Sequence, residues 1–186
     1  MKAPLASCMI GAVLAFGAAA PPAVLAQRLT MDTPAAPALN KGDQKIIAEL
    51  ARANIAEIEA GKLALARGQS PQIKAYAKQM IDEHTQALNE VKRLAQDKGV
   101  NLPTEADARH KALVKMLGKL EGVKFDKAYL TQAGVRDHTK VHAALEQHHA
   151  RAKDQDLKAF ISKMLPTVEQ HLHHATQMQE GATAPK

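Results

Sequence analysis

Apolar residues recur every three or four positions from about residue 43 to residue 180, and no segment shows sustained alternation of apolar and polar residues. This period is typical of amphipathic helices and not of half-buried strands. Glycine and proline residues divide the pattern into segments. One short helix is expected from residue 104 to about 120, and four long helices are expected over residues 43–67, 70–98, 125–153 and 155–179. The pattern therefore predicts an all-α fold.

Residues at the expected helix ends agree with this division. Ser70 is a good N-cap, and Pro71 suits the first helical position. Asp43 is the expected N-cap of the first long helix, and Thr104 with Asp107 resembles a capping box at the start of the short helix. Pro166 falls inside the last helix, where it removes one backbone hydrogen bond and should bend the helix.

The two halves of the chain look related. Ile73–Tyr76 and Met80 recur as Leu157–Phe160 and Met164, at a constant offset of 84 residues. This repeat indicates a duplicated helical hairpin, and two hairpins that cover each other's apolar faces form a four-helix bundle. The long connector between the hairpins either crosses the length of the bundle, as in ferritin-like folds, or caps one end.

The N-terminal residues are typical of an export signal. Lys2 precedes an apolar run, and Val24–Ala26 offers a cleavage site before Gln27. Residues 1–26 are therefore predicted to be a signal peptide, and the mature protein to be periplasmic or secreted. Cleavage would remove Cys8, the single cysteine, so that no disulfide is expected in the mature chain.

The composition of the chain limits the classes of binding partner. The chain has a formal net charge of +6, but aromatic residues make up only 3% of it, and charges of both signs alternate along the helices. A basic surface without aromatic stacking platforms argues against nucleic-acid binding. No segment of the expected mature chain is long and apolar enough to span a membrane.

One residue with metal-binding capacity lies on or near the inner stripe of each long helix: Glu57, His84, His138 and His171. At 1.5 Å per residue, all four lie about 18–25 Å from the nearest hairpin turn, in helices about 40 Å long. They should therefore meet near the middle of the bundle. Such a set can bind zinc, copper, nickel or iron, with Asp137 as an acceptor behind a ligand. The alternative is a hydrogen-bonded polar network without metal, which the sequence slightly favours, because buried polar groups need partners in any case.

A weaker candidate lies at His142, Glu146 and His149, spaced i, i+4 and i+7 on an outward face. This spacing is more typical of a solvated surface than of a metal site. The sequence carries no glycine-rich phosphate loop and no nucleophile elbow, so that no catalytic residues are predicted and a non-enzymatic role is favoured.

Several blocks of the chain match one family in order: Gly61–Leu65, Ile73–His84, Phe125–Leu130, Asp137–His138, Leu165–Pro166 and His171–Leu172. Together they resemble the bacterial ferritin-like proteins called domain of unknown function 4142, over about residues 43–178. The resemblance implies a ferritin-like four-helix bundle, and with the pattern above the expected fold is an antiparallel bundle with an extra short helix in the connector. It also implies an exported protein with a peripheral association with the outer membrane. The expected division is a signal peptide (1–26), a disordered leader (27–42), the bundle (43–180) and a flexible tail (181–186).

The residues depart from the di-iron pattern of ferritins, in which Glu precedes a ligand His by three positions. Ile81 and Val168 occupy those positions before His84 and His171. A single His-rich site is therefore favoured over a di-iron site. The leading hypothesis is a periplasmic bundle that binds a metal ion, or a protein partner during envelope stress. The alternatives are a metal-dependent oxidoreductase that uses the same residues and a purely structural envelope scaffold; the oligomeric state is not predicted.

Overall fold

The computed structural model describes residues 39–181, and every regular element in this range is helical. In chain order the elements are α1 (Lys41–Arg67), α2 (Pro71–Asp97), α3 (Ala108–Leu117), α4 (Gly122–Tyr129), the π-helical segment η1 (Leu130–Asp137), α5 (His138–Arg151) and α6 (Gln155–Gly181). The prediction of an all-α fold is confirmed for these residues. The predicted signal peptide, residues 27–38 of the predicted leader and residues 182–186 of the predicted tail lie outside the described range.

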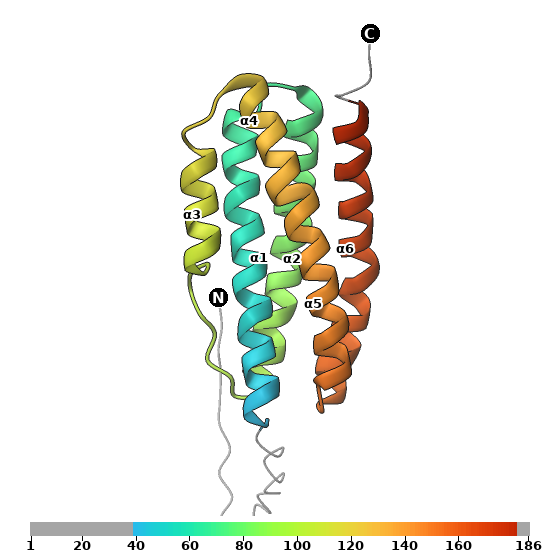
Figure 1. The fold of residues 1–186 in the computed structure, drawn as a ribbon. Helices are drawn as coiled ribbons and strands as arrows, with labels where there is room; N and C mark the ends of the chain where they lie inside the picture. The colour runs from blue at the N-terminus through green and yellow to red at the C-terminus, as the bar shows by residue number, and fades with distance from the viewer. Residues whose placement is uncertain (1–38, 182–186) are drawn as a thin grey trace, which may run out of the picture. The chain divides into compact units, whose positions relative to one another are not determined.

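Four long rods lie side by side in a helical bundle: α1, α2, the continuous run of α4, η1 and α5, and α6 (Figure 1). Short turns join α1 to α2 and α5 to α6, so each of these pairs is antiparallel. The short helix α3 lies against the outer side of α1.

The connector between α2 and α4 crosses the whole length of the bundle (Figure 1). At the end of α2, Lys98 contacts Asp154 in the α5–α6 turn, with Nζ 2.7 Å from Oδ2. At the start of the next rod, Asp126 accepts hydrogen bonds from the backbone N–H groups of Gln69 and Ser70 in the α1–α2 turn, both at 2.9 Å. These contacts tie the two ends of the connector to opposite ends of the bundle, which decides between the two arrangements left open above.

Capping explains where the helices begin. Ser70 is the N-cap of α2, as predicted, and its Oγ accepts from Ile73 N at 3.1 Å. The predicted cap of α1 is wrong: α1 begins at Lys41, and Asn40 is its N-cap, accepting from Asp43 N at 3.0 Å. Lys41 therefore belongs to the helix and not to the predicted leader.

Asp43 has a tertiary role instead. Its buried carboxylate accepts from the backbone N–H groups of Lys153 and Asp154 at 2.8–3.1 Å, and so joins the start of α1 to the α5–α6 turn. The prediction of a capping box at Thr104 is also wrong, because Asp107 is the N-cap of α3 and accepts a hydrogen bond from His110 N at 3.0 Å.

The third rod differs most from the prediction. It begins at Gly122, three residues early, and is π-helical over residues 130–137. A hydrogen bond from the side chain of His138 to the carbonyl of Ala133 (2.9 Å) spans the last turn of this segment. The sequence carries no signal for the π segment. The helix α6 continues through Pro166 and ends at Gly181.

The buried apolar residues form two clusters at different heights. One cluster includes Ile47 and Leu157 and lies near the α5–α6 turn, whereas the other includes Ile73 and Phe125 and lies near the α1–α2 turn. Between the two clusters the buried residues are polar: Asn54, Glu57, His84, Asp137, His138 and His171. A polar layer therefore crosses the middle of the bundle, at the height expected for the predicted site.

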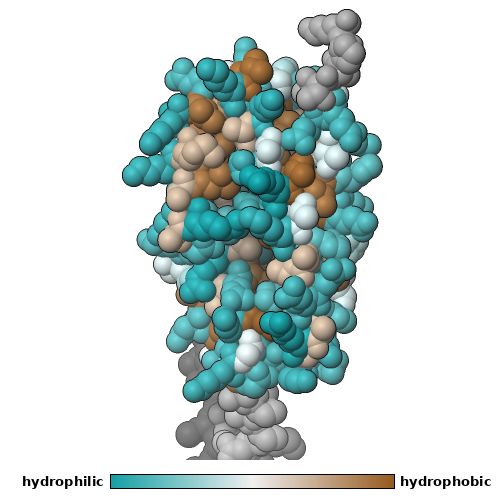
Figure 2. Space-filling model, in the orientation of Figure 1, coloured by the Kyte–Doolittle hydropathy of each residue, from teal (hydrophilic) through white to brown (hydrophobic). Residues whose placement is uncertain are grey.

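The face seen in Figure 2 is mainly hydrophilic, with apolar patches between the helices. Within the described residues, no helix has both the length and the apolarity needed to cross a membrane. Polar side chains thus cover most of the face seen in Figure 2, while the unusual polar groups are those in the interior of the bundle.

Candidate metal centre

Three histidines from three different rods meet in the polar layer. His84 comes from α2, His138 from the first position of α5 and His171 from α6. One ligand atom of each lies within 4.8 Å of the others, and the ring centroids are 5.2–5.8 Å apart. All three are buried, with 1–6% of their surface exposed. The described residues contain no other group of three or more His, Cys, Asp or Glu side chains this close together.

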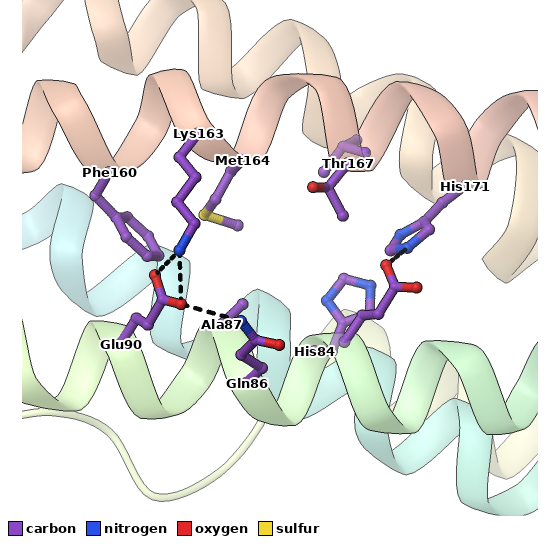
Figure 3. A pocket seen from close by; sticks show the side chains of 11 residues that line it. His84, Gln86, Ala87, Glu90, Phe160, Lys163, Met164, Thr167 and His171 are labelled. Atoms are coloured by element: carbon purple, nitrogen blue, oxygen red, sulfur yellow. Dashed lines mark hydrogen bonds and ion pairs between the residues drawn. The ribbon is translucent and has the colours of Figure 1, made fainter.

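In each imidazole, one ring nitrogen lies within hydrogen-bonding distance of an oxygen atom. The pairs are His84 Nδ1 and Asn54 Oδ1 (3.0 Å), His138 Nδ1 and Ala133 O (2.9 Å), and His171 Nε2 and Glu83 Oε2 (2.7 Å; Figure 3). A carbonyl and a carboxylate can only accept. The Asn54 amide is oriented by its Nδ2, which donates to Leu50 O at 2.8 Å, so that its Oδ1 accepts as well. The hydrogen-bonded nitrogen of each ring therefore carries the proton.

The second nitrogen of each ring consequently carries a lone pair. These atoms are His84 Nε2, His138 Nε2 and His171 Nδ1, and all three are buried without a hydrogen-bond partner. Buried polar atoms in proteins almost always have a partner, so three such atoms in one place need an explanation. A metal-binding histidine typically donates its other N–H to a carboxylate, an amide or a backbone carbonyl, as each of these rings does.

Burial favours the neutral form of all three rings. Burial lowers the pKa of His84 well below its usual value, and the neighbouring His138 and His171 lower it further. Burial also lowers the pKa of His138 and of His171, although the hydrogen bond to Ala133 and that to Glu83 oppose this effect. Neutral imidazole is the form that binds metal ions.

Glu57 of α1 lies in the same layer. Its carboxyl group is buried, and Oε2 has no hydrogen-bond partner. Burial and the nearby Asp137 carboxylate raise the pKa of Glu57 to about 8, against the opposing effects of His110 and Arg109.

With His84 and His138, Glu57 lines a cavity of about 20 Å³. One water needs about 10–15 Å³ of such volume, so the cavity has room for a single small ion or molecule. The group of three histidines itself does not include Glu57.

The chain matches the family described as domain of unknown function DUF4142 over residues 28–178. It belongs to this family. The match confirms the resemblance seen in the sequence, and the matched range contains all three histidines and Glu57. No curated protein and no solved structure matches the chain.

In this DUF4142 protein Asp137 does not have the role expected for it. Its Oδ1 accepts from Arg109 Nη1 at 3.0 Å, and its Oδ2 lies 3.8 Å from His110 Nε2, so it faces α3. Successive residues in a helix point about 100° apart, which turns Asp137 away from the imidazole of His138. The acceptors behind the three rings are Asn54, Glu83 and Ala133 instead.

The sequence carried only part of the signal for these acceptors. Asn54 lies on the inner stripe of its helix, three residues before Glu57, and this polar residue on an apolar stripe was a usable sign. Glu83 directly precedes His84 but serves the histidine of another helix. The carbonyl of Ala133 is a backbone group and has no sequence signal.

The weaker candidate does not form a compact set. His142 Nδ1 lies 3.9 Å from Glu146 Oε2, and these side chains are 30% and 63% exposed. His149 does not join them in a group of potential ligands. An exposed pair at this distance is an ordinary feature of a helix surface.

Proposed function

We propose that this DUF4142 protein binds one transition-metal ion through His84, His138 and His171, with Glu57 on the facing wall as a further ligand. The observation that carries the proposal is the set of three imidazole lone pairs, buried, unpartnered and drawn from three rods. The unpartnered Oε2 of Glu57 beside them supports it.

The alternative is a polar network without metal, and this alternative has a specific weakness. A network of that kind satisfies its members through one another, because an unpaired buried polar atom costs about 1–3 kcal/mol. Here every ring uses one nitrogen for a hydrogen bond and leaves the other without a partner. A metal ion accounts for all of these atoms at once.

The chemistry of the donors favours certain metals. Imidazole nitrogens suit zinc, copper, nickel and iron, whereas magnesium and calcium prefer oxygen ligands. Val168, three residues before His171, is buried and lines the small cavity. A bridging carboxylate is therefore missing at this position, which favours one ion over two.

The test is metal analysis of the protein purified without a polyhistidine tag. Zinc, copper, nickel and ferrous iron are then titrated into the metal-free protein under calorimetric or spectroscopic detection. We expect one equivalent of metal per chain in the wild type. The His171→Ala and His138→Ala variants should lose this tight equivalent, because two imidazoles cannot replace three.

His173→Ala is the matched control, because His173 is an exposed histidine on the same helix as His171. This control should bind metal like the wild type. Metal binding far below one equivalent for every ion tested would refute the proposal. Unchanged binding in His171→Ala would refute the assignment of the ligands.

We also propose that the bundle is ferritin-like and that the protein is exported. The crossing connector between two antiparallel hairpins supports the first statement, and the apolar run before Val24–Ala26 supports the second. N-terminal sequencing of the protein recovered from the periplasm should then begin at Gln27. An N-terminus at Met1 in the cytoplasmic fraction would refute the export proposal.

A further inference from the structure

A groove between α2 and α6 opens at the surface and ends at two of the three histidines (Figure 3). His84 and His171 form its inner end, and Lys163 with Glu90 lies at its other end. The volume of the groove is about 340 Å³, whereas one water needs about 10–15 Å³ of such volume. The groove therefore has room for a metal ion together with several of its waters.

The charges along the groove leave one carboxylate uncompensated. At the outer end, Lys163 Nζ lies 2.8 Å from both carboxylate oxygens of Glu90. The second carboxylate of the lining belongs to Glu83, whose side chain is 39% exposed. Its Oε2 accepts from the ring of His171 at 2.7 Å, and burial favours the neutral form of this ring. The inner end of the groove is therefore negative and attracts cations.

A second cavity, of about 210 Å³ between α1, α3 and α5, offers a less direct approach to the polar layer. None of the described residues that line it is one of the four proposed ligands. Leu50, Ala53 and Val141 line both this cavity and the small interior cavity of Glu57 and His138, so they form a wall between the two spaces. The groove, in contrast, reaches two of the ligand rings themselves.

We propose that the metal ion enters and leaves the bundle through the groove between α2 and α6, and that Glu83 binds it before the histidines do. The inference rests on the metal site proposed above. An ion on the Glu83 carboxylate competes with the N–H group of His171 for the same oxygen, and so frees this ring to turn. The lone pairs of His84 Nε2 and His171 Nδ1, both buried without a partner, then receive the ion. Glu83 is thus a transient ligand and does not belong to the final set.

The experiment follows the association and dissociation of cobalt(II) at constant pH, by its visible absorption in stopped flow. Glu83→Gln removes the charge at the inner end but keeps an oxygen that can accept from His171. We expect association in this variant to be about tenfold slower than in the wild type at low ionic strength. The difference should shrink as salt is added, because salt screens the attraction between the carboxylate and the approaching ion.

Asp82→Asn is the matched control for the loss of charge. Asp82 directly precedes Glu83, its side chain is 59% exposed, and it does not line the groove. Its replacement removes the same charge from the same helix. This control should bind cobalt at the wild-type rate, because the proposed effect depends on a carboxylate inside the groove.

A second variant tests the route itself. Ala87→Leu narrows the groove from the α2 wall and should slow both association and dissociation by about tenfold, with little change in affinity, because one path serves both directions. Ala144→Leu is its matched control, since Ala144 is also a half-buried alanine but lines the second cavity. This control should keep both rates. If Ala87→Leu binds less than one equivalent of cobalt, Thr167→Leu narrows the groove from the α6 wall and serves in its place.

The outcomes separate the role of Glu83, the route and the metal site. A wild-type association rate in Glu83→Gln would overturn the role of Glu83. Wild-type rates in the narrowed variant, or slow binding in Ala144→Leu alone, would overturn the route. In each of these cases one equivalent of cobalt still binds at equilibrium, and the metal site stands. A wild-type protein that binds no cobalt would overturn the metal site and the route together.

Discussion

The pair formed by His84 and Asn54 allows a quantitative test of the unpartnered nitrogens. The pair is buried, and His84 Nε2 has no hydrogen-bond partner, whereas Nδ1 lies 3.0 Å from Asn54 Oδ1. A buried nitrogen without a partner lowers the stability of the fold as long as no metal is bound to it. Replacing both residues by apolar ones, as in His84→Leu/Asn54→Ala, should then leave the metal-free protein as stable as the wild type or more stable.

The magnitudes follow from the hydrogen bonds. Asn54→Ala alone leaves both nitrogens of His84 unpartnered and should cost about 1–3 kcal/mol. His84→Leu alone exchanges one unpartnered atom for another, the Asn54 Oδ1, and should change stability by less than about 1 kcal/mol. The double variant removes the unpartnered His84 Nε2 together with two hydrogen bonds, one between His84 and Asn54 and one from Asn54 to Leu50 O. Because no buried polar side-chain atom of this pair is left without a partner, we expect between no change and a gain of about 2 kcal/mol.

Urea unfolding in the presence of a chelator measures these differences. The corresponding shifts in melting temperature are about 2–4 °C per kcal/mol for a protein of this size. Bound metal should make the wild type more stable than the double variant. At a metal concentration a thousand times the dissociation constant, it adds about 4 kcal/mol to the unfolding free energy of the wild type and nothing to that of the variants that lack His84.

The claim that His84 Nε2 has no partner would be refuted by two results together: His84→Leu loses more than about 3 kcal/mol of unfolding free energy, and Asn54→Ala is as stable as the wild type. It would mean that His84 Nε2 has a strong partner in the native protein. His173→Ala is again the control, and should stay within about 0.5 kcal/mol of the wild type.

Three further predictions concern the frame around the site. Asp43→Ala removes the acceptor of two backbone N–H groups in the α5–α6 turn and should cost about 2–4 kcal/mol in urea unfolding; a cost below about 0.5 kcal/mol would contradict the assigned role. Gly134→Ala would place a Cβ atom 2.9 Å from that of Ala175, and should cost about 1–3 kcal/mol, to be recovered in part by adding Ala175→Gly. Lys98→Met should reduce stability by about 1 kcal/mol near neutral pH, through loss of the ion pair with Asp154. Burial raises the pKa of Asp154, but hydrogen bonds from Lys98 and from backbone N–H groups bring it below its ordinary 3.8. A depressed carboxyl pKa stabilises the fold at pH values above 3.8, and this stabilisation is lost as the pH falls through the pKa of the folded state. The difference in unfolding free energy between Lys98→Met and the wild type should therefore shrink in acid. A difference that stays constant down to about pH 2 would contradict this prediction.

The apolar period and the cap at Ser70 were enough to predict the helices, because both act within one helix. The heights of Glu57, His84, His138 and His171 were also predictable, since helix rise is constant along a rod. Asn40 and Asp43 show the limit of such local signals. Both residue types cap helices well, and only the contact of Asp43 with a turn more than 100 residues away gave the cap to Asn40.

Local patterns in the sequence were sufficient to predict the helices of residues 39–181 and the common height of Glu57, His84, His138 and His171. The path of the connector along the bundle, and the choice of the nitrogen that remains without a partner in each imidazole, depend on contacts between distant parts of the chain. Helix period depends on neighbours a few residues apart, whereas the orientation of a ring depends on acceptors such as Asn54, Glu83 and a backbone carbonyl, which only packing brings within hydrogen-bonding distance.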